Sequence, residues 1–510
     1  MADKTKFIEE LNAKYQPKGE YIVLGKGMLD GEVITEVDVN IPLKTINRHG
    51  LIAGATGTGK TKTLQVFVEQ LSHKGIPTLV MDIKGDLSGI AVEGEQNDKI
   101  NERYAKTKLP YQPQSFPVEL MTISAEKGLK LRATVTEFGP VLLSKILGLN
   151  DTQSSIMSIV FKYADDKGLP LIDLDDLKKT LQYVTDNDEG KKELASNYGA
   201  ISPASLGAIL RSIVAMEQQG ATSFFGEPSF DVEDLLQTRG GKGVVNVLRV
   251  ADIQNQPQLF STFMLSLFAE IYMTFPEEGD SGKPKLVLFI DEAHLIFNEA
   301  SKALLSQIET MVKLIRSKGV GIYFITQIPG DVPENVLAQL GLKIQHALRG
   351  FTAKDRKEID KAVENYPITE YYDAGNLIQN LGIGEAFVTA LDEKGIPTPL
   401  VQTYLISPES RMDVLSSDEI DDLVNASDLA EKYNKEIDKE SAYEILTKRM
   451  ETAAAAEQEV KQEKSTARQP KEEPGMFEQV LKSRAGRTFT NTLAREGAKF
   501  VLGMFGLKMR

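Results

Sequence analysis

A glycine-rich loop early in the chain has the residue types and spacing of a phosphate-binding site. The stretch Leu51–Leu64 reads LIAGATGTGKTKTL and fits the pattern GxxxxGK[ST]. Glycines let the backbone wrap around phosphates with its N–H groups pointing inward, and the helix that follows adds the positive end of its dipole. We expect Lys60 to bind the β- and γ-phosphates and Thr61 to bind Mg²⁺ through its hydroxyl. The expected nucleotide-binding residues are Gly54, Ala55, Thr56, Gly57, Thr58, Gly59, Lys60, Thr61 and Lys62.

A pair of acidic residues supplies the second half of such a site. Asp291 and Glu292 follow the apolar run Leu286–Ile290, which is typical of a buried strand, and ligands of open α/β sheets bind at the carboxyl ends of strands. Asp291 is expected to hold Mg²⁺ together with Thr61, and Glu292 to polarise the attacking water. Two solvated acids at a strand end are the alternative interpretation. Together with the glycine loop, the pair indicates ATP hydrolysis with Mg²⁺.

Further polar side chains could respond to the γ-phosphate. Gln327 ends the apolar strand Gly321–Thr326, where a neutral amide could sense that phosphate or merely bond a loop. With one glycine loop and one acidic pair, the chain has a single motor core whose site is open on one side. A ring in which each subunit offers an arginine to the next would complete it. The candidates are Arg316 and Arg349, with Arg356 weaker; otherwise these arginines make ion pairs.

Two more groups of residues lie at strand ends. Asp82, Lys84 and Asp86 in MDIKGDLSG could couple the nucleotide to a pore loop, or could form an ordinary turn after a strand. His294 completes the letters DEAH, which also name a class of helicases with two motor domains in one chain. Because this chain has one motor core, we interpret His294 as a structural residue.

The surrounding elements must bring these residues together. An amphipathic helix is predicted after the glycine loop, because apolar residues recur at helical spacing from Leu64 to Leu71. Apolar strands and helices then alternate, which is typical of a mostly parallel sheet with helices on both faces. Helical stretches without strands over about 140–235 indicate an insertion, and a closing hairpin is expected around Asp392–Gly395.

The sequence therefore predicts an α/β fold with a mostly parallel sheet flanked by helices, a small N-terminal β segment, a helical insertion and a helical C-terminal tail. The expected divisions are 1–45 for the β-rich N-terminus, 46–139 and 236–410 for the two parts of the ATPase core, 140–235 for the insertion, 411–451 for an acidic helical segment, 452–475 for a linker and 476–510 for a basic amphipathic tail. The tail could be a strap on a neighbouring subunit, a nucleic-acid contact or a membrane-surface helix.

Composition limits the class of protein. The chain has 510 residues, 41% of them hydrophobic and 26% charged, with no cysteine and a net charge of −14. No apolar run approaches the ~18 residues of a membrane span, and the charged N-terminus does not have the pattern of a signal peptide. We therefore expect a cytoplasmic protein without a membrane partner. The acidic balance still allows nucleic acid, because a ring can line a narrow pore with lysines.

Five stretches together resemble the HerA-like branch of the FtsK–HerA superfamily of P-loop ATPases, and the YjgR-type helicase family within it. They are RHGLIAGATGTGKT, LVMDIKGDLSG, LVLFIDEAHLIF, FITQIPGDVPENVLAQLG and QHALRGFTAKDRKEI. The resemblance implies a RecA-like core, hexameric rings that pump double-stranded DNA through a central channel, and the roles given above to the matching residues. Fewer than 50 residues precede the core, so the β-barrel on which the nuclease partner of HerA docks is reduced, and that partner is not expected.

The sequence thus favours an ATP-hydrolysing ring motor that translocates or unwinds DNA, with hydrolysis at subunit interfaces. The alternative is a DNA-independent ATPase that remodels or tethers protein partners, at the membrane surface if the tail binds there.

Overall fold

The computed structural model describes residues 3–253, 256–279, 281–299, 302–435, 437 and 439–466. The chain divides into two compact units. The first comprises residues up to Leu131 together with Phe230–Lys435, and it contains every predicted site residue. The second comprises Arg132–Ser229 and the described residues after Lys435.

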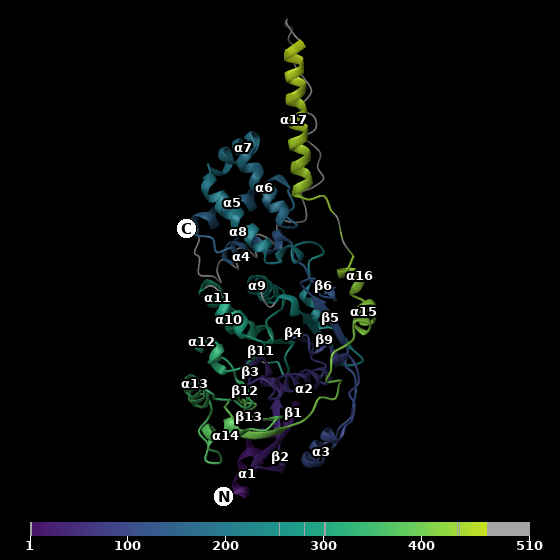
Figure 1. The fold of residues 1–510 in the computed structure, drawn as a ribbon, viewed down its shortest axis with the longest axis vertical. Helices are drawn as coiled ribbons and strands as arrows, with labels where there is room; N and C mark the ends of the chain where they lie inside the picture. The colour runs from purple at the N-terminus through teal and green to yellow at the C-terminus, as the bar shows by residue number, and fades with distance from the viewer. Residues whose placement is uncertain are drawn as a thin grey trace. The chain divides into compact units, whose positions relative to one another are not determined.

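Within the described residues, the first unit is built on a 12-stranded sheet (Figure 1). Its strand order is β2-β1-β14-β13-β12-β3-β11-β10-β4-β9-β5-β6. Neighbours from β12 to β6 are parallel, and those from β2 to β12 are antiparallel. The strands are β1 Tyr21–Leu29, β2 Glu32–Pro42, β3 Gly50–Ala53, β4 Thr78–Asp82, β5 Val118–Thr122, β6 Leu129–Lys130, β9 Val245–Arg249, β10 Leu286–Ile290, β11 Val320–Thr326, β12 Leu342–Gln345, β13 Glu385–Thr389 and β14 Val401–Leu405, with a separate hairpin of β7 Thr238–Arg239 and β8 Lys242–Gly243.

Helices cover both faces of the parallel strands. The side chains of each buried strand alternate between the two faces, so an entirely apolar strand presents apolar side chains on both. Phe289 of β10 packs edge-on against Phe67 of α2 (Lys60–His73), at a centroid distance of 5.6 Å. On β11, Phe324 packs against Phe297 of α10 (His294–Glu299) at 5.3 Å. Both faces are therefore apolar, which explains the continuous apolar runs in the sequence.

The remaining helices of this unit flank the sheet or follow its strands. They are α1 Lys4–Tyr15, α3 Asp98–Thr107, α9 Pro257–Thr274, α11 Lys302–Ile315, α12 Glu334–Leu337, α13 Ala353–Glu364, α14 Ala374–Asn380, α15 Ser417–Asn425 and α16 Ala430–Tyr433. The predicted α/β fold with a mostly parallel core is confirmed, as is the hairpin around Asp392–Gly395, which joins β13 and β14.

The second unit is helical. It contains α4 Val135–Ile146, α5 Asp151–Lys167, α6 Leu174–Asp186, α7 Asp188–Tyr198, α8 Pro203–Glu217 and α17 Ala442–Thr466. The start of α17 is tied to α6, because the N–H of Tyr443 donates to Asp176 Oδ1 at 2.8 Å. Among the described residues, no single helix is both long and apolar enough to cross a bilayer, although α7 and α8 together pass that test across a bend of 108°.

The structure differs from the expected divisions in several places. The N-terminal strands are not a separate segment, because β1 pairs with β14 and extends the core sheet, and α1 precedes them. The expected boundary at residue 140 falls inside α4. The first part of the expected linker, 452–466, is helical and continues α17. The expected tail 476–510 lies outside the described residues.

Candidate nucleotide-hydrolysis site

The predicted site residues meet at the carboxyl ends of four neighbouring parallel strands in the middle of the sheet. In the sheet, β11 lies between β3 and β10, and β10 pairs with β4. Ile290, the last residue of β10, pairs with both Phe324 of β11 and Met81 of β4. The glycine loop after β3, Gln327 after β11 and the Asp291–Glu292 pair after β10 therefore leave the sheet side by side.

The glycine loop has the backbone that a phosphate cradle needs. Gly57 and Gly59 adopt φ angles of 78° and 111°, in the left-handed region that favours glycine. At Gly54 the requirement is close packing, because a Cβ there would lie 2.5 Å from the Cβ of His346. The loop is also held from outside: the N–H of Ala55 donates to the carbonyl of Ala347 at 2.8 Å. The cradle is thus shaped by the chain that follows β12 as well as by its own glycines.

Lys60 is buried and is held by the loop itself. Its ammonium donates to the carbonyl oxygens of Gly54, at 2.6 Å, and of Ala55, at 3.2 Å. Burial lowers its pKa, and the positive charge of Lys84 acts in the same direction. Anionic phosphates would give this ammonium stronger partners than neutral carbonyls do.

Asp291 and Glu292 are both buried at the end of β10, with 3% and 8% of their surfaces exposed. Burial raises the pKa of Asp291 to about 7, while Lys84 opposes that rise. Glu292 has a φ angle of 46°, a left-handed backbone conformation that non-glycine residues rarely adopt. Strain of this kind is maintained when surrounding contacts fix the residue, and it clusters at functional sites.

Two side chains lie close to the carboxylate of Glu292, each next to a different oxygen. The ammonium of Lys84 makes an ion pair with Oε1. Nδ1 of His294 lies 3.1 Å from Oε2. The structure therefore gives His294 a contact in the site rather than the purely structural place that we expected from the sequence. It also brings Lys84, but not Asp82, to the acidic pair.

Asp82 has the ordinary turn role that was one of its two interpretations. Its carboxylate accepts hydrogen bonds from the N–H groups of Gly85, Asp86 and Leu87 at 2.7, 3.1 and 3.1 Å. Lys62 is likewise engaged elsewhere: its ammonium donates to the carbonyl of Met412 at 2.6 Å. The Lys62 side chain is thus held by the C-terminal segment and not directed at the glycine loop by any of these contacts.

A cavity of about 400 Å³ opens beside the glycine loop. Ala55, Thr56, His294 and the exposed Gln327 line it, together with Arg349. Gln327 therefore shares this cavity with the glycine loop and with His294, which lies next to Glu292.

The two candidate arginines lie in different places. The guanidinium of Arg349 lines that cavity and donates to the carbonyl oxygens of Gln379 and Leu381, the latter at 3.5 Å. Arg316 instead precedes β11, close enough to His49 at the start of β3 for its charge to help burial lower the pKa of that histidine. Arg349 is therefore near the glycine loop of the same chain, whereas Arg316 lies at the opposite, amino ends of the parallel strands.

The residues present fit both ATP and Mg²⁺. Oδ2 of Asp291 is buried and accepts no hydrogen bond, which is the state of an oxygen available to a cation. Thr61 lies in the first turn of α2, at the mouth of the cradle. The described residues hold no cluster of three or more metal-ligating side chains. Mg²⁺ in nucleotide sites is commonly bound by one or two protein groups together with phosphates and water, and Asp291 and Thr61 are two such groups.

Comparison with known proteins identifies the family. Residues 29–504 match the model of the family described as Helicase HerA-like C-terminal. The chain belongs to this family. A curated relative, the DNA double-strand break repair helicase HerA of Saccharolobus solfataricus, is 22% identical to this HerA-like chain over 385 residues, which cover 74% of this chain and 68% of the relative.

Solved structures show the same fold as the HerA-like chain. The bacterial conjugative coupling protein TrwBdeltaN70, in its unbound monoclinic form, matches with a TM-score of 0.51 and 14% identity over 80% of this chain and 94% of its own. The plasmid coupling protein TrwB in complex with a non-hydrolysable ATP analogue matches with a TM-score of 0.51 and 15% identity over 82% and 96% of the two chains. The expected HerA-like family and RecA-like P-loop fold are thereby confirmed.

Sequence reasoning missed the role of His346 in this HerA-like site. The residue is fully buried, its Nε2 lies 2.9 Å from the hydroxyl of Thr63, and burial lowers its pKa to about 4. It is therefore a neutral side chain that packs the start of α2 and the glycine loop against the chain after β12. The signal in the sequence was a histidine directly after an apolar strand, in KIQHALRG.

Proposed function

We propose that the chain is a Mg²⁺-dependent ATPase motor of HerA type that acts on DNA as a homo-oligomeric ring. The observation that carries the ATPase part is the meeting of the glycine loop, Asp291, Glu292 and Gln327 at the ends of neighbouring strands. The DNA part is supported by the family and by the relative named as a DNA repair helicase.

The residues divide the reaction among them. Lys60 exchanges the carbonyls of Gly54 and Ala55 for phosphate oxygens and binds the triphosphate, while the loop N–H groups orient it. Glu292 accepts a proton from water and directs that water to the γ-phosphorus. Asp291 and Thr61 would hold Mg²⁺, which neutralises phosphate charge when bound.

Two further groups would link hydrolysis to the rest of the ring. Gln327, on the neighbouring strand end, would hydrogen-bond the γ-phosphate and lose that contact after hydrolysis. Arg316 is the better candidate for an arginine that enters the site of the next subunit. It lies at the amino ends of the parallel strands, away from the glycine loop of its own chain. In a head-to-tail ring, opposite sides of adjacent copies face each other.

The ATPase assignment is tested with Glu292→Gln, which keeps the size of the side chain but removes its basicity. We expect kcat to fall by about 10²- to 10⁴-fold, with ATP binding retained in an equilibrium assay. Glu102→Gln, an exposed substitution on α3, is the matched control and should leave kcat unchanged. Normal turnover by Glu292→Gln would show that another residue acts as the base.

The DNA assignment is tested by the ATPase rate of the full chain with and without duplex DNA at low salt, run beside its native mass. We expect stimulation that weakens as salt rises, because phosphate contacts release counterions, and a mass of several subunits. DNA-independent turnover would instead favour an ATPase that remodels or tethers protein partners.

A further inference from the structure

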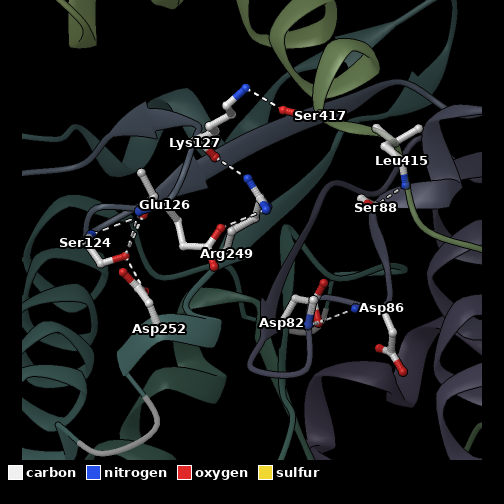
Figure 2. Close-up of polar contacts among 12 residues, drawn as sticks. Asp82, Asp86, Ser88, Ser124, Glu126, Lys127, Arg249, Asp252, Leu415 and Ser417 are labelled. Atoms are coloured by element: carbon white, nitrogen blue, oxygen red, sulfur yellow. Dashed lines mark hydrogen bonds and ion pairs between the residues drawn. The ribbon is translucent and has the colours of Figure 1, made fainter.

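Lys84 stands on a loop that the structure holds firmly. The loop follows β4, and the carboxylate of Asp82 accepts three of its backbone N–H groups, including that of Asp86 in Figure 2. Gly85 provides the left-handed turn, with a φ angle of 74°. Fixed in this way, the loop gives the Lys84 side chain a defined starting point.

A second element supports the same loop from the C-terminal segment. The N–H of Leu415 donates to the hydroxyl of Ser88 at 2.9 Å, a contact that Figure 2 shows beside the Asp82 turn. The same segment holds Lys62 of α2 through the carbonyl of Met412. The loop that bears Lys84 and the helix that follows the glycine loop are thus tied to one stretch of chain.

From this loop Lys84 reaches the acidic pair on the neighbouring strand. Its ammonium makes an ion pair with Glu292 Oε1 and lies 4.0 Å from Asp291 Oδ2. Nδ1 of His294 lies 3.1 Å from Oε2, but this oxygen accepts no hydrogen bond, so the ion pair with Lys84 is the contact that holds the carboxylate of Glu292. The side chain of Lys84 is 37% exposed, whereas that of Glu292 is 10% exposed, so the lysine closes the solvent side of a buried carboxylate.

We propose that Lys84 is a positioning residue that fixes the carboxylate of Glu292 for hydrolysis. The inference rests on the proposed role of Glu292 as the base. A carboxylate on a strained backbone that is held by one ion pair loses its orientation when that ion pair is removed. Misplacing a reacting group by about 1 Å costs on the order of 100-fold in rate. A group that only bound ATP would change KM instead.

The test compares Lys84→Met with Lys84→Arg in the full chain, measuring kcat, KM for ATP and equilibrium ATP binding. For Lys84→Met we expect kcat to fall by about 10- to 100-fold, with KM and ATP affinity within about threefold of the unsubstituted chain. Lys84→Arg keeps the cation and should retain most of kcat. An unchanged kcat in Lys84→Met, or a loss confined to KM, would overturn the proposal, as would a loss in Lys84→Arg equal to that in Lys84→Met.

Lys127→Met is the matched control, because it also removes a lysine from a loop that follows the carboxyl end of a parallel strand. Lys127 follows β5, and its ammonium donates to the hydroxyl of Ser417 at 2.7 Å (Figure 2). The same ammonium makes an ion pair with Asp421. Its loss should leave kcat unchanged, and an equal loss in this control would show a general effect of disturbing such a loop. The Glu292→Gln variant, run in parallel, separates the two hypotheses: if it turns over normally, the proposed base is wrong, independently of the result for Lys84.

Discussion

Glu69 of α2 carries a carboxyl group whose effect on stability can be worked from the structure. The residue is 2% exposed, and its carboxylate accepts the N–H groups of Glu409 at 2.8 Å and of Ser410 at 3.1 Å. Burial raises its pKa from 4.5 to about 7, and these donors oppose the rise without cancelling it. The folded chain therefore keeps a proton on Glu69 at pH values where the unfolded chain has released it.

The sign follows from which state holds the proton. Below pH 4.5 Glu69 is protonated in both states, and above about pH 7 it is ionised in both. Between these values the folded state binds the extra proton, so stability falls as pH rises, by about 1.4 kcal/mol for each pH unit. Over the whole window the loss amounts to about 3 kcal/mol.

Glu69→Gln removes the titration, and urea unfolding of both proteins at about pH 5 and about pH 8 measures it. We expect the stability difference between the original chain and the variant to become about 2–3 kcal/mol less favourable to the original chain at the higher pH. Asp82 and Asp291, whose pKa values burial raises to about 6 and about 7, titrate in both proteins and cancel in the comparison. Equal differences at the two pH values would refute the reasoning, because they would mean that the hydrogen-bond donors keep Glu69 ionised.

Two further predictions concern the glycine loop and the arginines. Gly54→Ala would place a Cβ 2.5 Å from that of His346, so we expect ATP affinity to fall by at least about tenfold, whereas Gly330→Ala, which has open space around it, should leave the affinity unchanged in the same titration. Arg316→Ala should lower kcat by about 10³-fold, and activity should return when the variant is mixed with hydrolysis-dead subunits that carry Arg316; Arg349→Ala should not be rescued by mixing, and the reverse pattern would exchange the two roles.

Local patterns predicted much of the fold. The helix after the glycine loop was correct because Leu64, Phe67, Val68 and Leu71 are all buried on one face. Helix α1 was not predicted, although its sequence has a similar signal. Phe7, Leu11 and Tyr15 recur at helical spacing and are fully buried, but the charged residues between them obscured the pattern.

Contacts between distant segments could not be read in this way. The approach of Lys84 to Glu292 depends on the register of β4 against β10, and more than 200 residues separate the two strands in the sequence. No sequence periodicity encodes such a register. For the same reason, the packing of His346 on the glycine loop required the pairing of β12 with β3 to be known.

The two outer strands of the sheet, β6 and β2, limit how copies of the chain can join. At one end β6 consists of Leu129 and Lys130, too short to template another strand. At the other end lies β2, and the amide of Asn12 on α1 donates to the carbonyl of Glu36 there at 3.2 Å. Exposed edge strands are where chains commonly fuse by adding strand to strand. With one edge strand short and the other contacted by α1, the copies in the ring that we propose would be joined through side-chain surfaces, which can separate and re-form in each cycle without breaking a backbone ladder.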